Sequence, residues 1–322
     1  MAVKWGILST ARINQLFLAG VRSAEDVEVV AVGSRDRDRA AAFAAEHGME
    51  RVHGGYEELL ADPEVEAVYN PLPNSLHVEW TVRALEAGKH VLCEKPLGRH
   101  PREVERAFDV ADRERRLLME AFMYRHNPQT KRLVELVDGG AIGTLRVVRA
   151  AFSFLARDPR NVRLSAALDG GALMDVGCYC VSGARLLAGE PECVSGQQLL
   201  GGGGVDVVFV ATMRFGGDVL AHFDAGLALA PRDELEVVGD EGTLFLDDPW
   251  HCRAPLIELR TADGVEPIEV PVADSYRLEA ENFSRAIRGE AEPLLGRVDA
   301  LGQARVIEAL YEAAETGQTV KP

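Results

Sequence analysis

The sequence predicts an α/β protein. We expect an N-terminal, doubly wound parallel sheet, followed by an α+β domain with an open, mostly antiparallel sheet. In the first third of the chain, apolar runs of strand length alternate with stretches of helical periodicity, a pattern typical of parallel strands joined by right-handed crossovers. Beyond Met123, strand-like runs follow one another with only short turns between them, which favours antiparallel pairing. The expected domains are residues 1–122 and 123–322.

The predicted strands of the first domain cover residues 3–8, 27–32, 67–69, 90–93 and 117–121. Apolar side chains recur at helical spacing over residues 13–21 and 78–85, and Gly88 is a typical helix stop. In the second domain we expect helices over residues 129–137, 172–187, 276–287 and 298–314. The expected strands there are 145–154, 193–200, 205–215, 219–229, 234–238, 243–246 and 256–259. The four glycines 201–204 are interpreted as a hairpin loop, because no helix start follows them.

Composition and charge exclude several classes of protein. The 322 residues include 35 basic and 51 acidic side chains, a formal charge of −16, and such a surface repels phosphate backbones. We therefore expect neither nucleic acid nor an anionic membrane as a partner. No segment has the roughly 20 consecutive apolar residues of a membrane span, and the N-terminus lacks the features of a targeting peptide. The five cysteines are scattered without zinc spacing, so we expect a cytoplasmic protein with reduced thiols and no metal site.

The stretch GILSTARIN, residues 6–14, follows the first predicted strand, where a dinucleotide-binding protein keeps its G-x-G-x-x-G fingerprint. Here Ser9, Ala11 and Asn14 occupy the three glycine positions. Ala11 adds only a methyl group where the backbone approaches the pyrophosphate, and hydroxyls in this turn could cap the helix or bond a phosphate oxygen. A guanidinium in the turn could add a cation. The candidate phosphate-binding residues are Ser9, Thr10, Ala11, Arg12 and Ile13.

The end of the second predicted strand distinguishes NAD from NADP. NAD-specific proteins usually carry an Asp or Glu there, which binds the ribose hydroxyls. This chain has Ser34 and Arg35 instead, and Arg39 follows in the same run. A hydroxyl beside a guanidinium suits the 2′-phosphate of NADP, although the Arg-Asp alternation over residues 35–39 also fits a solvated helix start. We expect NADP(H) as the preferred cofactor, with NAD(H) as the alternative.

Three separated motifs point to a known family. AGKHVLCEKPL at residues 87–97 places a Glu-Lys-Pro triplet directly after a predicted buried strand, and NPLPNSLH at residues 70–77 follows the preceding strand. GGALMDVGCY at residues 170–179 lies in the second domain. Together they resemble the Gfo/Idh/MocA oxidoreductase family, and the resemblance extends over essentially the whole chain. It implies an N-terminal Rossmann domain, a C-terminal domain whose open sheet often makes the oligomer contact, and an active site between the two.

The resemblance also implies roles for individual residues. Lys95 matches the family's catalytic lysine, and Asp175 and Tyr179 match the helix that faces the nicotinamide. Many relatives, the inositol dehydrogenases among them, have His in place of Tyr179; a tyrosine there resembles the dihydrodiol dehydrogenase, glucose–fructose oxidoreductase and xylose dehydrogenase branch. The absent fingerprint glycines are a second departure from the common pattern. The further residues that the resemblance places at the cofactor are Pro71, Leu72, Asn74, His77 and Glu94.

The residue types suggest a mechanism. Asp175 and Tyr179 are four residues apart and would share one face of a helix. A phenol, with a pKa of about 10, exchanges protons poorly at neutral pH, and a neighbouring ammonium favours the phenolate. We therefore expect hydride transfer between nicotinamide C4 and a carbinol or carbonyl carbon, with Tyr179 as general acid or base and Lys95 tuning it and polarising the substrate oxygen. The plainer alternatives are a turn lysine, a tyrosine in a core and an aspartate that caps its helix.

Four further residues are candidate substrate contacts. Arg125 and His126 follow the last strand of the first domain, at the expected domain junction where a substrate would lie. Junction salt bridges are the alternative for this pair. Asn161 and Arg163 lie on a loop before the Gly-Gly motif.

The resemblance implies an oxidoreductase that acts on a sugar or cyclic polyol as a homodimer or homotetramer through the C-terminal sheet. A ketoreductase for a nucleotide-activated sugar is a variant of this function, though no obvious basic cluster marks a diphosphate site. An NAD-dependent glycoside hydrolase is disfavoured by Ser34 and Arg35. A non-catalytic NADP-binding regulator is disfavoured by the presence of Lys95, Asp175 and Tyr179 together.

Overall fold

The computed structural model describes all 322 residues, and the chain forms two compact units. The first unit comprises Met1–Met123 and Asp274–Leu301, and the second comprises Tyr124–Ala273 and Gly302–Pro322. From the sequence we expected a single boundary, with every residue after 122 in the second domain. The boundary at Met123 lies within one residue of that expectation, but the chain returns to the first unit over residues 274–301.

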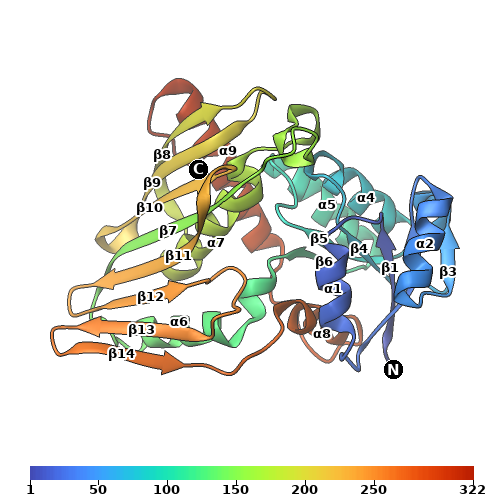
Figure 1. Ribbon diagram of the computed structural model, residues 1–322, viewed down its shortest axis with the longest axis horizontal. Helices are drawn as coiled ribbons and strands as arrows, with labels where there is room; N and C mark the ends of the chain where they lie inside the picture. Colours follow the sequence, from blue (N-terminus) through green and yellow to red (C-terminus); the bar gives the residue numbers. More distant parts are fainter. The chain divides into compact units, whose positions relative to one another are not determined.

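A six-stranded parallel sheet with flanking helices forms the first unit (Figure 1). Its strands are β1 (Val3–Leu8), β2 (Val27–Gly33), β3 (Arg51–His53), β4 (Ala67–Asn70), β5 (His90–Glu94) and β6 (Leu118–Ala121). Its helices are α1 (Asn14–Val21), α2 (Arg37–His47), α3 (Tyr56–Leu60), α4 (His77–Glu86), α5 (Pro101–Glu114), α8 (Ser275–Ile287) and the 3₁₀ turn η1 (Asn74–Leu76). The strands follow the order β3-β2-β1-β4-β5-β6, and every neighbouring pair is parallel. The order reverses between β1 and β4, the switch point at which doubly wound sheets bind nucleotides beyond the carboxyl ends of their strands.

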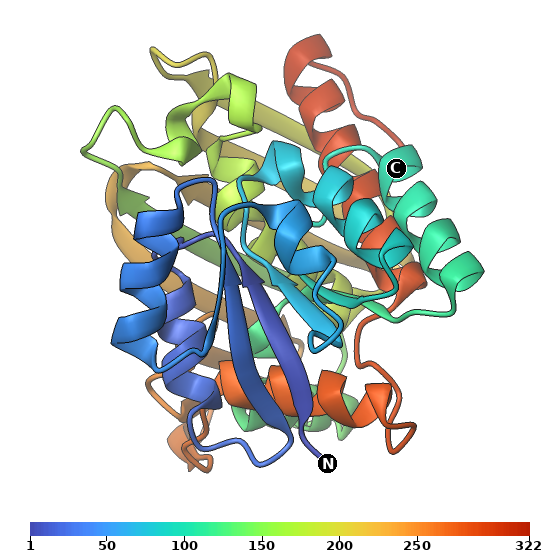
Figure 2. The same cartoon turned by 90° about the vertical axis from the view of Figure 1, so that its right-hand side faces the viewer.

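The returning helix α8 belongs to the first unit because its apolar face completes the core beside β1. Phe283 is fully buried, and its ring lies 5.8 Å from that of Trp5. The indole Nε1 of Trp5 donates to Ser284 Oγ at 3.1 Å. Figure 2 shows α8, in orange, crossing beside the blue strand β1. Burying a side chain such as Phe283 stabilises a fold by roughly 1.5–3 kcal/mol, which a helix in solvent would lose.

An eight-stranded sheet forms the second unit (Figure 1). Its strands are β7 (Leu145–Leu155), β8 (Pro191–Leu200), β9 (Asp206–Phe215), β10 (Val219–Gly226), β11 (Ala228–Gly239), β12 (Thr243–Asp247), β13 (Leu256–Thr261) and β14 (Gly264–Glu269). Its longer helices are α6 (Pro128–Asp138), the π-helix η5 (Leu173–Gly177), α7 (Cys178–Ala188) and α9 (Arg297–Thr316), which belongs to this unit from Gly302 onward. Short 3₁₀ turns are η2 (Met123–His126), η3 (Val162–Leu164), η4 (Ala166–Leu168) and η6 (Gly216–Asp218). The order is β14-β13-β12-β11-β7-β10-β9-β8, and only β7 and β10 pair in parallel.

The predicted fold class is confirmed, and the differences from the predicted elements have local causes. The strand expected over residues 219–229 is β10 followed by the start of β11, because an apolar run hides the turn at Leu227. The edge strands β3 and β14 were not predicted, since neither has a buried apolar face. The helix expected over residues 172–187 begins with the π-helix η5. None of the helices combines the length and the apolar character that crossing a bilayer requires.

Candidate active site

The turn between β1 and α1 takes the backbone path of a glycine fingerprint without its glycines. Ser9 has a φ of 76°, in the left-handed region that favours glycine. Its main-chain N–H donates to Gly33 O at 2.7 Å, and its Oγ accepts from Ala11 N at 3.3 Å. Asn14, fully buried at the start of α1, donates from its side-chain amide to Ser9 O at 2.9 Å. Hydrogen bonds of the Ser9 and Asn14 side chains therefore stabilise a turn conformation that usually requires glycine.

The start of α1 is suited to an anion. No side chain caps the helix at Ile13. The first amides of the helix, those of Asn14, Gln15 and Leu16, donate to the main-chain oxygens of Ala11, Arg12 and Ile13 at 3.1, 3.2 and 3.0 Å. Uncapped helix amides are a common phosphate site, and the exposed Arg12 lies in the same turn. The predicted phosphate-binding turn thus combines the start of a helix with an exposed cation.

Two guanidinium groups gather beyond the end of β2. Arg39 Nη2 donates to Thr10 Oγ1 at 3.3 Å, which links the second strand end to the phosphate turn. Arg35 donates to the hydroxyl of Tyr56, a residue that the sequence analysis did not single out. Burial raises the pKa of Tyr56 against the opposing effect of the two arginines, so its hydroxyl stays neutral. With the nearly buried hydroxyl of Ser34 beside them, two cations stand where a ribose phosphate would lie.

His77 connects the loop after β4 with the turn after β5. Its ring is 1% exposed, with Nδ1 2.8 Å from Pro96 O and Nε2 2.7 Å from Leu72 O. Burial lowers the pKa of His77 to about 4. Both ring nitrogens face main-chain oxygens and so link the two loops, and contact of His77 with the cofactor stays a prediction. Of the other predicted loop residues, Pro71 is buried and Asn74 is half-buried in η1.

The Glu-Lys-Pro turn is anchored through Glu94. Its Oε1 accepts from the hydroxyl of Tyr69 at 2.5 Å, and its Oε2 accepts from Lys95 N at 3.3 Å. Tyr69 is fully buried and stacks on Phe17 of α1 at a ring distance of 4.1 Å. The carboxylate is therefore engaged in positioning the turn, while Lys95 is half-buried at the carboxyl edge of the sheet.

In the second unit, a buried carboxylate binds the first amide of the helical segment that carries Tyr179. Asp206 Oδ2 accepts from Leu173 N at 2.7 Å, and its Oδ1 accepts from the Tyr311 hydroxyl at 2.9 Å. Gly171 has a φ of 123°, and a Cβ at this position would collide with Asp206. The second glycine of the Gly-Gly motif is therefore required by both conformation and space.

Asp175 lies in the π-helical turn η5 and is paired with an arginine. Arg163 Nε donates to Asp175 Oδ2 at 2.6 Å. Asn161 Oδ1 accepts from Arg163 N at 3.1 Å and so caps η3. The N-cap position of η5 is Ala172, and Asp175 lies within the helix, so the alternative of Asp175 as a helix cap does not hold. The structure thus brings together three of the predicted substrate residues, Asn161, Arg163 and Asp175. Of these, Asp175 lies on a π-helix, an element that is frequent at functional sites.

Tyr179 is enclosed by aromatic rings that the sequence analysis did not identify. The residue is 6% exposed, and its ring lies 5.8 Å from Tyr124, 5.4 Å from Phe152 and 6.0 Å from Trp250. These three rings come from η2, β7 and the loop after β12. No periodicity links such distant positions, so only the fold reveals them.

The remaining predicted pair, Arg125 and His126, lies on η2. His126 is 3% exposed, and burial lowers its pKa to about 3. Its Nε2 has no hydrogen-bond partner in the protein. Arg125 is half-buried. Contact of either side chain with a substrate stays a prediction.

Comparison with known proteins matches both units. Residues 3–122 match the oxidoreductase family with an NAD-binding Rossmann fold, and residues 130–245 match the GFO/IDH/MocA C-terminal domain. The D-xylose 1-dehydrogenase (NADP(+)) 2 of Haloferax volcanii is 37% identical over 322 residues, covering 98% of this chain and 99% of the relative. The trans-1,2-dihydrobenzene-1,2-diol dehydrogenase of Danio rerio is 34% identical and covers 89% of each chain.

A solved structure agrees with these relatives. The crystal structure of a 3-ketoreductase from Actinomadura kijaniata in complex with NADP and TDP-benzene has a TM-score of 0.92 at 32% identity, covering 97% of this chain and 98% of that one. The same reductase has been solved with a tyrosine replaced by phenylalanine and with a lysine replaced by alanine or glutamate. Since both domain families match in order and the similarity covers nearly the whole length, the chain belongs to the Gfo/Idh/MocA family of NAD(P)-binding oxidoreductases.

Proposed function

We propose that the protein is an NADP(H)-preferring oxidoreductase that interconverts a carbinol and a carbonyl group on a sugar or cyclic polyol. The observation that carries the proposal is the surroundings of Tyr179: a phenol enclosed by aromatic rings, one helical turn from the Asp175–Arg163 ion pair. Burial among rings excludes water from a proton-transferring group, and the ion pair offers partners for substrate hydroxyls. The named activities of the xylose and dihydrodiol dehydrogenases support this substrate class.

The preference for NADP(H) rests on the strand end at Ser34. A 2′-phosphate there would meet Arg35 and Arg39, and no acidic side chain stands at the position that reads an unphosphorylated ribose. When bound, the nicotinamide supplies or accepts the hydride. The printed names of two relatives, the xylose dehydrogenase and the ketoreductase, also specify NADP.

Two arginine variants test the cofactor assignment. Arg35→Ala should weaken NADPH binding about 10- to 100-fold, the value of one or two charge-assisted hydrogen bonds, and leave NADH binding unchanged. Arg12→Ala, in the pyrophosphate turn, should weaken both cofactors to a similar degree. Titration of each variant by nicotinamide fluorescence measures the two dissociation constants. If Arg35→Ala lost affinity for NADPH and NADH equally, Arg35 would not bind the 2′-phosphate.

The proposed chemistry assigns proton transfer to Tyr179. In oxidation the phenolate of Tyr179 takes the proton of the substrate hydroxyl, while a hydride passes from the carbon that bears this hydroxyl to the nicotinamide. In reduction both transfers reverse. Lys95 favours the phenolate and polarises the substrate oxygen. The lysine and the tyrosine substituted in the 3-ketoreductase are separated by the same number of residues as Lys95 and Tyr179, which supports their correspondence.

A substrate panel tests the activity. Purified protein with NADP⁺ or NAD⁺ is incubated with D-xylose, other aldoses, inositols and cyclic diols, and the absorbance of reduced nicotinamide is followed. Tyr179→Phe should lower kcat by ~10²–10⁴-fold, the usual contribution of positioned acid–base catalysis, with NADPH affinity retained. Near-normal turnover of Tyr179→Phe would refute the role, and tight cofactor binding with no turnover across the panel would favour a regulator.

A ketoreductase acting on a nucleotide-activated sugar is the second candidate, favoured by the TM-score of 0.92 to the 3-ketoreductase solved with TDP-benzene. A dTDP-activated ketosugar should then oxidise NADPH faster than any free aldose reduces NADP⁺. If the free sugars give the higher kcat/KM, this candidate is excluded.

We also infer that the protein self-associates through the open face of the eight-stranded sheet. Val210 on β9, Leu220 on β10 and Leu199 on β8 are 48%, 51% and 64% exposed on one face, and exposed apolar side chains of this kind mark interaction surfaces. Light scattering after size exclusion measures the mass. Leu220→Lys should shift a dimer or tetramer toward monomer, whereas Leu294→Lys, an exposed leucine of the first unit, should not.

The compartment stays the one predicted from the sequence. We propose the cytoplasm on the cysteine pattern of the sequence, five scattered residues without a paired spacing.

A further inference from the structure

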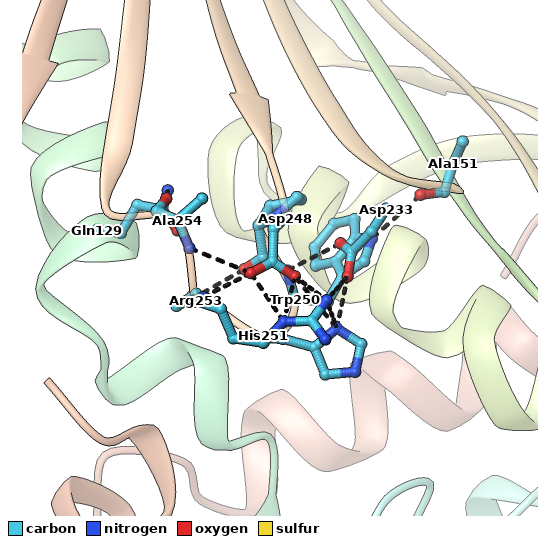
Figure 3. A network of polar contacts seen from close by, with 10 residues as sticks. Gln129, Ala151, Asp233, Asp248, Trp250, His251, Arg253 and Ala254 are labelled. Carbon is cyan, nitrogen blue, oxygen red and sulfur yellow. Dashed lines mark hydrogen bonds and ion pairs between the residues drawn. The ribbon is translucent and has the colours of Figure 1, made fainter. Parts of the chain in front are cut away.

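The loop over residues 248–253, between β12 and β13, is held by a cluster of charged side chains (Figure 3). Arg253 Nη2 donates to Asp248 Oδ1 at 2.6 Å, and His251 Nδ1 lies 2.5 Å from Asp233 Oδ2. Asp233 belongs to β11, so the contacts tie the loop to the neighbouring strand. We call Asp233, Asp248, His251 and Arg253 the loop clamp.

The loop clamp also fixes the main chain of the loop. Asp248 Oδ2 accepts from the amides of Arg253 and Ala254, at 2.5 and 3.2 Å. Asp248 N donates to Asp233 O at 2.7 Å, and Trp250 N donates to Asp233 Oδ1 at 3.3 Å. The start of the loop is therefore held by the main-chain oxygen of Asp233, its middle by the Asp233 carboxylate at Trp250 N, and its end by the Asp248 carboxylate.

Trp250 is the side chain that this loop delivers to the interior. It is fully buried, and its Nε1 donates to Ala151 O at 3.2 Å. Its ring lies 6.0 Å from Tyr179, and a Cβ at Gly183 would come within 2.8 Å of it. Gly183 follows Tyr179 by four residues and so lies on the same face of α7. A glycine inside a helix costs stability relative to alanine, and here it admits the indole to the helix face that carries Tyr179.

A metal ion is the other occupant that the loop clamp suggests, since ligand atoms of Asp233, Asp248 and His251 lie within 4.8 Å of one another. Arg253 already supplies a positive charge there, 2.6 Å from Asp248 Oδ1 and 3.9 Å from Asp233 Oδ2. Burial acts to raise the pKa of Asp248, but the hydrogen bonds from Arg253 outweigh it and leave that pKa lowered. The ionised Asp248 is thus balanced by its arginine, which favours a structural clamp.

We propose that Trp250 is a positioning residue for Tyr179, and that the loop clamp holds Trp250 in place from the opposite side of the loop. The inference rests on the proposed role of Tyr179 as acid or base. Trp250 fixes the plane of the phenol by packing against it, together with Tyr124 and Phe152. The exposed Arg253 then influences proton transfer without touching substrate or cofactor.

A double-mutant cycle tests the coupling, with the best substrate of the panel and with NADPH affinity as a check on folding. Trp250→Phe should lower kcat roughly 10- to 100-fold, the cost of a small misplacement of a catalytic group, with NADPH binding unchanged. In the Tyr179→Phe background the same substitution should change kcat by less than about twofold, because the group it positions is gone.

The outcomes separate this inference from the proposed function. If the losses of Trp250→Phe and Tyr179→Phe multiply in the double variant, Trp250 acts independently of Tyr179 and the inference is overturned, while the role of Tyr179 stands. If Tyr179→Phe alone retains full activity, the acid–base assignment fails and the inference fails with it.

A measurement that needs no turnover tests the loop clamp itself. Arg253→Gln should speed amide hydrogen exchange in α7 around Tyr179, because the loop behind Trp250 loosens. Arg260→Gln is the matched control: it breaks the Arg260–Glu258 ion pair, 2.7 Å long, on the adjacent β13. It should leave exchange in α7 unchanged. Equal exchange in Arg253→Gln and wild type would refute the clamp.

Discussion

At the scale of single residues, Ser9 shows how a nucleotide turn can form from a broken fingerprint. The left-handed conformation is imposed by the fold, since Ser9 N is bonded to the neighbouring strand and Ser9 O to the buried Asn14. A side chain in that conformation costs about 1–2 kcal/mol relative to glycine. The turn therefore retains the geometry of the fingerprint at the expense of some stability.

A pair of variants isolates this cost. Ser9→Gly and Ser9→Ala both remove the hydroxyl that accepts from Ala11 N, but only the glycine relieves the conformation at φ 76°. Ser9→Gly should be the more stable of the two by about 1 kcal/mol, the relief being partly offset by the entropy of a glycine in the unfolded chain. Urea unfolding gives both free energies. A more stable Ser9→Ala would mean that the hydroxyl, rather than the backbone, governs the turn.

Glu279 on α8 makes the stability of the fold depend on pH. It is fully buried, and neither carboxyl oxygen has a hydrogen-bond partner. Burial, with a smaller effect of Glu94, raises the pKa of Glu279 well above its usual value. The folded protein thus keeps a proton that the unfolded chain releases above pH 4.5, and stability falls as the pH rises from that value toward the raised pKa.

Glu279→Gln should remove this loss. We expect the variant to be more stable than wild type at pH 8 by at least about 1.4 kcal/mol, the equivalent of one pKa unit, with the difference vanishing near pH 4. Urea unfolding at the two pH values measures it. Glu281→Gln, which breaks a pair with Arg285 on the same helix, should give no such gain at pH 8. A pH-independent difference for Glu279→Gln would show that the carboxyl is ionised in the fold.

At the scale of elements, the segment η5–α7 is shaped by partners that come from elsewhere in the chain. The carboxylate of Asp206 on β9 accepts a hydrogen bond from Leu173 N, the first amide of the segment, and Gln303 of α9 donates to Cys178 O at 2.7 Å. Asp175 and Tyr179 were expected on one α-helix, and the intervening π-helical turn keeps them about one turn apart. The sequence motif therefore identifies the candidate residues, while the surrounding elements set their spacing.

Gly171→Ala tests the start of this segment. The substitution combines a disallowed φ of 123° with a collision against the buried Asp206, so we expect a loss of more than about 2 kcal/mol in unfolding free energy. Gly48→Ala is the control, because Gly48 has a φ of 72° with open space around its Cβ and should cost about 1 kcal/mol. Thermal unfolding of both variants measures the two losses of stability. Equal losses would show that the Asp206 side chain moves aside without cost.

At the scale of the whole molecule, the nucleotide-binding unit is completed by the segment Asp274–Leu301. The 150 residues Tyr124–Ala273 separate this segment from the rest of the unit. Phe283→Ala should destabilise this unit by about 3–5 kcal/mol, because the cavity opens against Trp5. Fluorescence of the tryptophans during urea unfolding measures the loss. Leu294→Ala, an exposed position in the same returning segment, should change stability by less than about 0.5 kcal/mol. If Phe283→Ala matched this control, α8 would not be part of that core.

The candidate site residues could be selected from the sequence because their signals are local. The EKP motif follows β5, Ser34 and Arg35 follow β2, and carboxyl ends of parallel strands necessarily meet at one edge of the sheet. Arg163 and Asp175 were both candidates, but nothing in their spacing predicted that they pair. The aromatic rings around Tyr179 and the arginine contact at Tyr56 had no signal at all, since each depends on residues brought together from distant segments.

The sequence by itself thus determined the two kinds of sheet, the order of the chemical groups along the chain and the class of cofactor, because periodicity, strand-end residues and charge act over a few positions. Only the tertiary structure decided that Ser9 takes a glycine conformation, that α8 returns to the first unit, and that a charged loop holds Trp250 behind Tyr179. These features arise from packing and hydrogen bonds between segments far apart in sequence, whose free energy is set by the shape of the completed core.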